Sequence, residues 1–373
     1  TLALITGHRA PASAASFGVN AFDLNTIPLS AVERVQLLFD STSVQHGMDA
    51  IGGVLNIVLR DEISHPSVQV HYGSADGGGN QVQTSGSLGY VGETAKAALM
   101  ADYSTTQTLL GGQRDLWADQ DYRRFGSLDQ RSNNSSPSNV TSLLPGNLPG
   151  LNSPIAAVPG SIAGERIALS EFLAGQLNLE SLLQYVPIVP DTSRASVIAN
   201  GQVELRPDLV ASAEVMYVDR SVRFPTVSPL VPGMVVPLTN PFNPFHAPVL
   251  VNARLVGLDR QEQNVDSTLA RGVGSLHGKA GAWTWELSLL CSEEDAEVRL
   301  ENTIDFLKLA QVLANPDPSQ TLDLFRPGPA ASQEVLDSLV TSSVNTFATD
   351  ATQVSGSSSG HVVELPGGLV TAM

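Results

Sequence analysis

The sequence predicts a mainly β chain, in which a partial antiparallel transmembrane β-barrel follows a smaller N-terminal domain. Three observations lead to this prediction. Several segments after residue 63 alternate apolar and polar residues, and short turns alternate with long polar connections along the chain. Residues 1–62, by contrast, show short apolar runs without alternation.

The alternating segments are the predicted strands, because a period of two is typical of a strand with two different faces. The clearest segment is 283–291, where Trp, Trp, Leu, Leu and Cys alternate with polar residues. Six more segments make seven strands in all, the last of them weaker: 68–72, 82–90, 95–103, 195–205, 209–217 and 268–279.

The connections between these strands favour a membrane barrel. Tight turns are predicted at 91–94, 206–209 and 279–282, and long extracellular loops at about 107–193, 221–267 and 298–361. Barrels of bacterial outer membranes have short periplasmic turns and long extracellular loops. A soluble antiparallel sandwich also alternates, but it rarely contains a connection as long as 107–193.

Parts of the long connections have their own patterns. Residues 165–185 place apolar side chains near helical spacing, and 306–315 form a second predicted helix that Pro316 ends. Residues 131–160 are rich in Ser, Asn, Pro and Gly, so they are predicted to be a mobile loop.

Composition excludes several classes of protein. Lys and Arg number 20 and Asp and Glu number 37, so the net charge is −17. Such an acidic chain is repelled by nucleic acid and by anionic lipid surfaces. The single cysteine, Cys291, excludes an intrachain disulfide framework. The chain shows no signal peptide and no initiator Met, so we expect a fragment of a longer protein.

The N-terminal region resembles the plug domain of TonB-dependent outer-membrane receptors. In that family a strand ending in a Gly-Arg turn precedes an "IP…IERVEVL" segment and then a "G.SA.YG.DAI.GVINI" segment. This sequence has, in the same order, LALITGHRAP at 2–11 and FDLNTIPLSAVERVQLLFDSTSVQHGMDAIGGVLNIVLRDE at 22–62. Two weaker resemblances are NPFNPF at 240–245 and LPGG at 365–368. The plug-motif positions are Arg34, Gly47, Asp49, Gly52, Gly53 and Asn56.

The resemblance implies a fold and a function. Residues 1–62 are expected to be the C-terminal half of an α+β plug, and 63–373 the first seven or eight strands of a 22-stranded barrel. The expected function is energised uptake of a scarce ligand across the outer membrane of a Gram-negative bacterium. The expected partners are outer-membrane lipid and the inner-membrane TonB complex, whose contact segment precedes the plug and is not in this sequence. Siderophore, cobalamin and oligosaccharide all stay open as ligands, and no cofactor is implied.

The resemblance also assigns roles to single residues. Gly52 and Gly53 are expected to allow positive φ angles or a close backbone approach. Asn56 lies in a predicted strand covered on both faces, where an unpartnered amide costs roughly 1–3 kcal/mol, so it must find hydrogen-bond partners. Asp49 is predicted to cap the turn after Gly47.

Glu33 and Arg34 are candidates for locking the plug to the barrel, because plug arginines in this family pair with barrel glutamates. The alternative is a solvated pair that contributes less than about 1 kcal/mol.

Signals of an enzyme are weak in this sequence. We therefore predict no enzymatic activity and no metal site. GSSSG at 356–360 has the G-x-S-x-G form around Ser358, but it lies in a Ser/Gly run without a preceding apolar strand. Asp115, Asp119 and Asp121 form an acidic loop that lacks the ligand spacing of a calcium site. The alternative functions are a non-transporting outer-membrane adhesin or a decayed receptor and, less favoured, a soluble secreted hydrolase.

Overall fold

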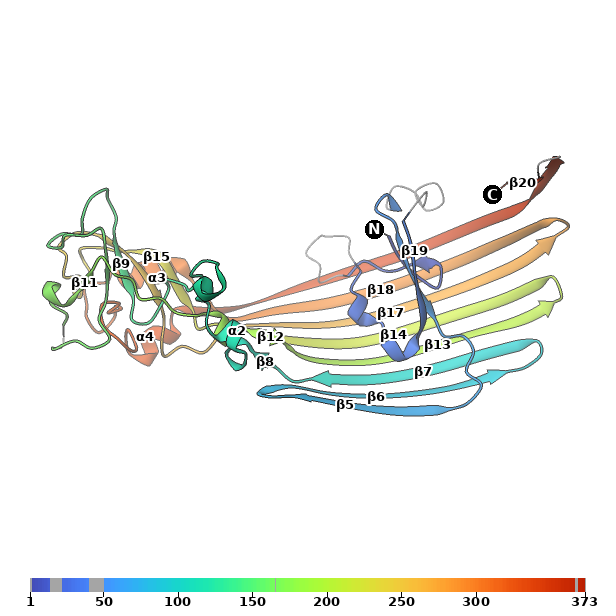
Figure 1. Cartoon of the computed structure of the whole chain (residues 1–373), viewed down its shortest axis with the longest axis horizontal. Coiled ribbons are helices and arrows are strands. Elements are labelled where there is room, and N and C mark those ends of the chain that lie inside the picture. The colour runs from blue at the N-terminus through green and yellow to red at the C-terminus, as the bar shows by residue number, and fades with distance from the viewer. Residues whose placement is uncertain (1, 14–21, 40–49, 165, 366–367, 373) are drawn as a thin grey trace.

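The computed structural model describes residues 2–13, 22–39, 50–164, 166–365 and 368–372. Figure 1 shows three parts along the long axis of the molecule. A long antiparallel sheet is the largest part, and the N-terminal unit (described residues up to 63) lies over its middle. The distal unit stands at the end of the sheet from which the long connections emerge, and these connections build it.

The long sheet has nine strands in the described residues, in the order β20-β19-β18-β17-β14-β13-β7-β6-β5. All neighbouring strands are antiparallel. The strands are β5 (Ser67–Ala75), β6 (Gly78–Val91), β7 (Ala95–Thr106), β13 (Asp191–Arg206), β14 (Leu209–Pro225), β17 (Glu262–Ala280), β18 (Trp283–Ile304), β19 (Val340–Leu365) and β20 (Gly368–Ala372).

The two faces of the sheet have different surroundings. Met100, Ile198 and Met216 lie side by side on neighbouring strands and are buried under the N-terminal unit. Their sequence neighbours Leu99 and Val215 are exposed on the opposite face. We call the face under the N-terminal unit the inner face and the opposite face the outer face. The alternation read from the sequence is therefore confirmed for these strands.

The strands are longer and the loops shorter than the sequence predicted. The connections in the structure are 107–190, 226–261 and 305–339. The predicted loop over 298–361 is wrong in large part, because residues 340–360 pair with β18. Small and polar residues dominate β19, so no apolar alternation marks it. Adding β19 and β20 also makes nine strands where seven or eight were predicted.

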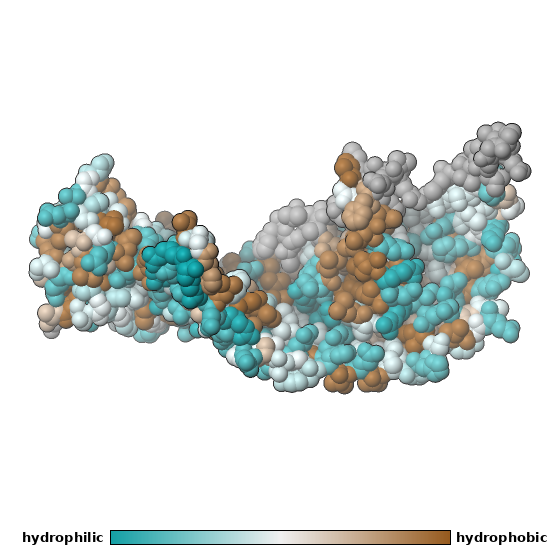
Figure 2. All heavy atoms as spheres, in the orientation of Figure 1, coloured by the Kyte–Doolittle hydropathy of each residue, from teal (hydrophilic) through white to brown (hydrophobic). Residues whose placement is uncertain are grey.

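The N-terminal unit contains a four-stranded sheet in the order β2-β1-β4-β3, in which β1 and β4 are parallel. Its elements are β1 (Leu2–Ile5), β2 (His8–Arg9), the 3₁₀ turns Leu24–Thr26 and Leu29–Ala31, β3 (Val32–Leu38) and β4 (Val54–Leu59). The predicted strand at 54–59 is confirmed. The edge strand β3 and the residue after it expose the apolar side chains of Val35, Leu37, Leu38 and Phe39. Figure 2 shows that hydrophobic residues gather over the N-terminal unit.

Gly53 and Asn56 shape β4. Gly53 has a φ of +95°, and a Cβ added to it would lie 2.7 Å from the carbonyl oxygen of Leu38. The Asn56 side chain accepts a hydrogen bond from the Gly7 amide at 2.9 Å and donates one to Gln36 Oε1 at 2.9 Å. Both ends of this amide are thus satisfied within an apolar strand, where an unpaired amide is costly.

Replacing Gly53 by valine should destabilise the N-terminal unit. The left-handed conformation costs a residue with a Cβ about 1–2 kcal/mol, and the contact with Leu38 adds a clash with backbone. The measurement is thermal unfolding of the purified full-length protein, together with its yield in the membrane fraction. Gly7→Ala is the control, because Gly7 has a φ of +83° and no atom within 4 Å of an added Cβ. The variant matched to this control is Gly53→Ala, which adds only the Cβ. Equal losses of stability in Gly53→Ala and Gly7→Ala would contradict the clash.

A shared apolar core joins the N-terminal unit to the inner face. Side chains from β1 and β4 pack against side chains from four strands of the long sheet. Burying one such aliphatic side chain contributes roughly 1.5–3 kcal/mol, so this core holds the unit on the sheet. Its members include Ile5, Ile57, Leu59, Met100, Ile198, Met216 and Leu269.

The distal unit has a second, larger core. Its sheet runs in the order β11-β10-β9-β16-β15, and the helices are α3 (Phe306–Leu313) and α4 (Gln333–Asp337). Phe172, Phe245 and Phe325 pack together, with ring centroids 4.9–6.3 Å apart, and each comes from a different long connection. The strands are β9 (Asn139–Ser142), β10 (Ile155–Ala157), β11 (Leu173–Ala174), β15 (Leu230–Val236) and β16 (Val249–Arg254).

The NPFNPF segment has a structural role in this unit. Asn240 Oδ1 accepts from the amide of Phe242, and Asn243 Oδ1 accepts from the amide of Phe245. The Nδ2 groups of both asparagines donate to backbone carbonyls of the surrounding chain, among them that of Leu313 in α3. Each asparagine therefore fixes a turn and ties it to its neighbours.

Short elements link the sheet to the distal unit. The strand β8 (Leu109–Leu110) pairs with β12 (Pro187–Val189), and α2 spans Asp115–Ala118. Further 3₁₀ turns are Gly111–Gln113, Tyr122–Phe125, Leu169–Glu171 and Leu183–Tyr185.

The helix predicted at 306–315 is confirmed as α3, and Asp305 caps it by accepting from the amides of Leu307 and Lys308. The helix predicted at 165–185 is wrong, because the described residues of this segment form turns and the short strand β11. Ile167 and Phe172 enter the distal core, whereas Leu173 of β11 is exposed. Residues 131–160, predicted to be a mobile loop, contain β9 and β10. No helix in the described part of the chain is long and apolar enough to cross a lipid bilayer.

Candidate functional site

A buried ion pair lies on the inner face, below the N-terminal unit. Arg271 of β17 pairs with Glu214 of β14, and their side chains are 0% and 10% exposed. Arg271 also donates to the carbonyl oxygen of Ile5 in β1 at 3.4 Å. The charges are thus neutralised within the long sheet, and a remaining N–H group reaches the N-terminal unit.

A second pair of the same kind lies nearer the long connections. Arg194 donates to Asp102 at 2.8 Å, and the Asp102 side chain is 1% exposed. Asp102 also accepts from Gln83 at 2.7 Å and from Ser30 of the N-terminal unit at 3.2 Å. Arg194 in turn donates to the carbonyl oxygen of Asn25 at 2.8 Å. Paired charges of the sheet again offer hydrogen bonds to the N-terminal unit.

Two basic side chains of the sheet pair directly with acids of the N-terminal unit. Arg220 pairs with Asp23. Lys96 Nζ lies 2.5 Å from Asp61 Oδ2 at the point where the chain leaves the N-terminal unit for β5. These pairs fix the two ends of the contact.

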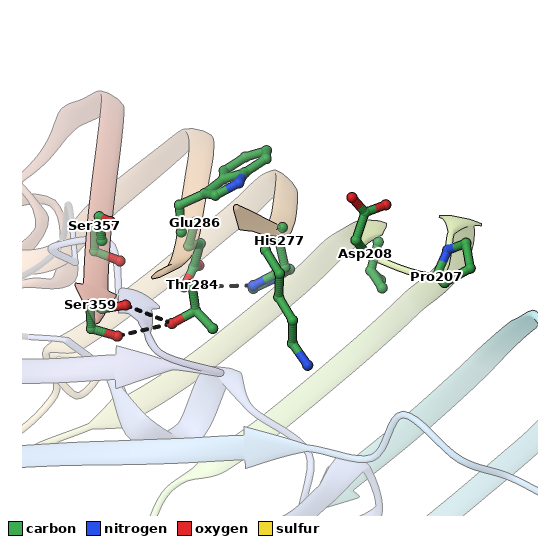
Figure 3. Close-up of a pocket in the computed structure, with 12 residues that line it drawn as sticks. Pro207, Asp208, His277, Thr284, Glu286, Ser357 and Ser359 are labelled. Atoms are coloured by element: carbon green, nitrogen blue, oxygen red, sulfur yellow. Dashed lines mark hydrogen bonds and ion pairs between the residues drawn. The ribbon is translucent and has the colours of Figure 1, made fainter. Parts of the chain in front are cut away.

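A cavity of about 520 Å³ separates the N-terminal unit from the sheet on the side of the short turns. A second cavity, of about 420 Å³, lies along the inner face beside those turns, and Figure 3 shows its polar lining. His277 lines both cavities. The first is also lined by His8, Glu33, Arg34, Lys96 and Glu214, and the second by Asp208, Glu286, Ser357 and Ser359.

The structure places the predicted site residues in different surroundings. Glu33 and Arg34 pair with each other at 2.5 Å, are about half exposed, and line the first cavity. In the described contacts Arg34 does not reach a carboxylate of the long sheet, because it lies on the edge strand β3. Gly52 lies in the turn before Gly53.

Gly47 and Asp49 lie outside the described residues. Sequence reasoning missed the arginines of the sheet, Arg194, Arg220 and Arg271. Their signal was an arginine on the same side of a strand as buried apolar residues, as with Leu269 and Arg271.

The outer face carries an apolar band. On β18 the outward residues from Trp283 to Cys291 are apolar, and Glu293 and Asp295 follow them. This run is roughly 26 Å long at about 3.3 Å per residue. Exposed aromatic residues lie near both ends of the band on neighbouring strands: Tyr72 and Tyr103 toward the long connections, Tyr90 and Trp283 beside the short turns.

Arginine side chains pair with a carboxylate of the acidic loop near α2. Asp121 pairs with Arg123, and Arg131 Nη2 lies 3.4 Å from Asp121 Oδ2. The Arg123 guanidinium holds the pKa of the Asp121 carboxyl at about 2. Across the described ranges, no group of three or more His, Cys, Asp or Glu side chains is arranged to hold a metal ion.

The GSSSG segment lies inside a strand. Ser358 is paired opposite Trp285, near one end of the β18–β19 ladder. A nucleophile of the G-x-S-x-G type needs a sharp turn from strand to helix, and this segment does not supply one.

No family model matches the chain. Among solved structures, the chain is similar to the siderophore receptor PiuA from Acinetobacter baumannii, with a TM-score of 0.37 and 12% identity over 96% of this chain and 47% of that one. It is also similar to BauA, the ferric preacinetobactin receptor of the same organism (TM-score 0.40, 9% identity, 96% and 53%). A third is the ferric enterobactin receptor PfeA of Pseudomonas aeruginosa (TM-score 0.35, 14% identity, 96% and 50%). The chain spans about half the length of each of these receptors.

Proposed function

We propose that this chain is part of a TonB-dependent outer-membrane receptor that takes up a scarce ligand with energy from the inner membrane. The N-terminal unit is the C-terminal half of the plug, and the long sheet is an arc of a wider barrel. The observation that carries the proposal is the position of the N-terminal unit on an inner face that combines buried ion pairs with an apolar core, in a sheet whose outer face carries an apolar band. The plug-like sequence at 2–11 and 22–62 falls in this unit.

The outer face supports a position in a membrane. Barrels of outer membranes carry an apolar band about 25 Å tall, with aromatic girdles at both edges. The band from Trp283 to Cys291 has a similar extent, and Tyr90 and Tyr103 lie near its two edges. The acidic residues beyond Cys291 then lie outside the hydrocarbon, on the side of the distal unit.

The proposed partners follow from this arrangement. The inner-membrane TonB complex is the energy source, and outer-membrane lipid covers the outer face. The distal unit and the apex of the plug are the proposed surfaces for the ligand, which is a siderophore, cobalamin or an oligosaccharide.

The full-length protein should fractionate with the outer membrane and migrate differently on gels with and without boiling. Heat-dependent migration is expected because a closed barrel resists detergent until it is heated. The measurement is a blot of separated membrane and periplasmic fractions. Recovery of the folded protein from the periplasm as a soluble species would overturn the proposal and favour a secreted hydrolase.

Growth distinguishes a receptor from an adhesin or a decayed receptor. Deleting the gene should slow growth on limiting iron, cobalamin or one defined carbon source if the protein transports. Unchanged growth under all these conditions, with loss of surface attachment, would favour an adhesin.

A further inference from the structure

His8 is a titratable side chain that the N-terminal unit inserts into the inner face. It follows the tight turn at Thr6 and Gly7, whose φ angles of +47° and +83° reverse the chain between β1 and β2. His8 Nε2 lies 3.5 Å from Ser275 Oγ and 4.0 Å from Glu286 Oε1. Its side chain is 17% exposed and lines the cavity of about 520 Å³, so the contact removes most, but not all, of the water around the ring.

Four charged or titratable groups of the sheet face His8. Glu286 of β18 and Glu214 of β14 attract a proton on the ring, whereas Arg271 and His277 of β17 oppose one. Glu214 is already paired with Arg271, and Glu286 lies 3.8 Å from His277 Nδ1. Each of these two carboxylates therefore has another partner in the sheet besides His8.

We infer that His8 makes the contact between the N-terminal unit and the sheet sensitive to pH, and that mild acid loosens this contact. A protonated His8 ring in this contact loses hydration that favours its charged form. The two carboxylates nearby do not replace that hydration, because Arg271 and His277 oppose their attraction. The inference concerns the contact alone and holds whichever function the protein has.

The direction follows from proton linkage. Burial lowers the pKa of His8 in the seated state, and the attraction of Glu286 only partly opposes this. Separation of the N-terminal unit returns the ring to water, where a histidine has a pKa of about 6.5. The separated state then binds the proton more readily. Seating is therefore strongest above about pH 6.5, weakens by up to tenfold per pH unit below it, and levels off below the lowered pKa.

Hydrogen exchange of the full-length protein in detergent tests this inference. The protection factors of the β1 and β2 amides, corrected for the intrinsic exchange rate at each pH, should fall between about pH 7.5 and 5.5. Amides of β17 and β18 serve as an internal reference and should not change. The inference is overturned if the protection of the β1 amides in the unmodified protein stays constant or rises on acidification. This test requires no variant.

Three variants separate His8 from other titrating groups. His8→Gln should remove the pH dependence of β1 protection, whereas His65→Gln, at an exposed histidine before β5, should leave it unchanged. Glu286→Gln should deepen the loss in acid, because it removes an attraction for the proton. An unchanged pH dependence in His8→Gln overturns the inference. Because the readout is local protection and not uptake, this failure is separate from failure of the proposed function.

Discussion

Replacing Arg271 by methionine should weaken the seating of the N-terminal unit by about 3 kcal/mol or more. The substitution leaves the carboxylate of Glu214 buried without its partner, and removing one member of a buried ion pair typically costs about 3–5 kcal/mol. Glu214 also lines the cavity of about 520 Å³, so water can enter and keep the cost at the lower end of that range. The hydrogen bond to the carbonyl oxygen of Ile5 is lost as well.

Hydrogen exchange gives the measurement, because about 1.4 kcal/mol corresponds to a tenfold change in an equilibrium constant. Protection of the β1 amides should fall by about a hundredfold in Arg271→Met. Arg299→Met is the matched control: its partner is Glu297 at 2.7 Å, and the side chains are 48% and 39% exposed. An exposed pair contributes less than about 1 kcal/mol, so this control should change little.

The double variant Arg271→Met with Glu214→Met decides the cause. Replacing both members of a buried pair by apolar residues is often nearly neutral. The double variant should therefore recover most of the lost protection. A single variant that behaves like Arg299→Met would show that the buried pair does not hold the N-terminal unit.

The sequence predicted that the strands have two different faces, but not which face is turned inward or how its residues pair. Leu269, Arg271 and Val273 alternate with small residues, so one strand face could be read directly. The ion pair with Glu214 depends on the register of β14 against β17, in which Met216 lies opposite Arg271. A connection as long as 226–261 places no limit on that register, because it contains no tight turn that aligns the two strands.

The distal unit could not be predicted for a related reason. Its core joins residues from three connections that are far apart in sequence, such as Phe172, Phe245 and Phe325. Short strands of two to seven residues leave too few positions for a period to show. The apolar residues of 165–185 consequently resembled a helix, although only Ile167 and Phe172 are buried in the core, and Leu173, Leu177 and Leu179 are exposed.

In the plug-like segment, the features that could be predicted are those that depend on local backbone conformation and local hydrogen bonding. Gly53 needs a positive φ angle, and Asn56 needs two hydrogen-bond partners, and both conditions follow from residue type within an apolar strand. The role given to Arg34 rested on the resemblance alone, and the structure pairs it with Glu33.

The chain 1–373 expressed by itself should not form a stable membrane barrel. The described sheet is open: β5 borders it on one side, and β19 with the short β20 borders it on the other. Each edge leaves roughly five residues with unpaired backbone groups in the hydrocarbon region, and each unpaired group costs several kcal/mol there. The total of tens of kcal/mol exceeds the 5–15 kcal/mol that typically stabilises a domain.

Closing nine strands into a small barrel would relieve the edges, but a barrel of about eight strands has an interior filled by side chains. The N-terminal unit already occupies the inner face through Ile5, Ile57 and Leu59, so closure would have to expel it.

The expected result is aggregation through the free edges. The test is refolding into detergent or lipid vesicles, followed by circular dichroism and protease digestion. A monodisperse, protease-resistant, β-rich monomer would show that the arc closes on itself, and the proposal of a wider barrel would fail.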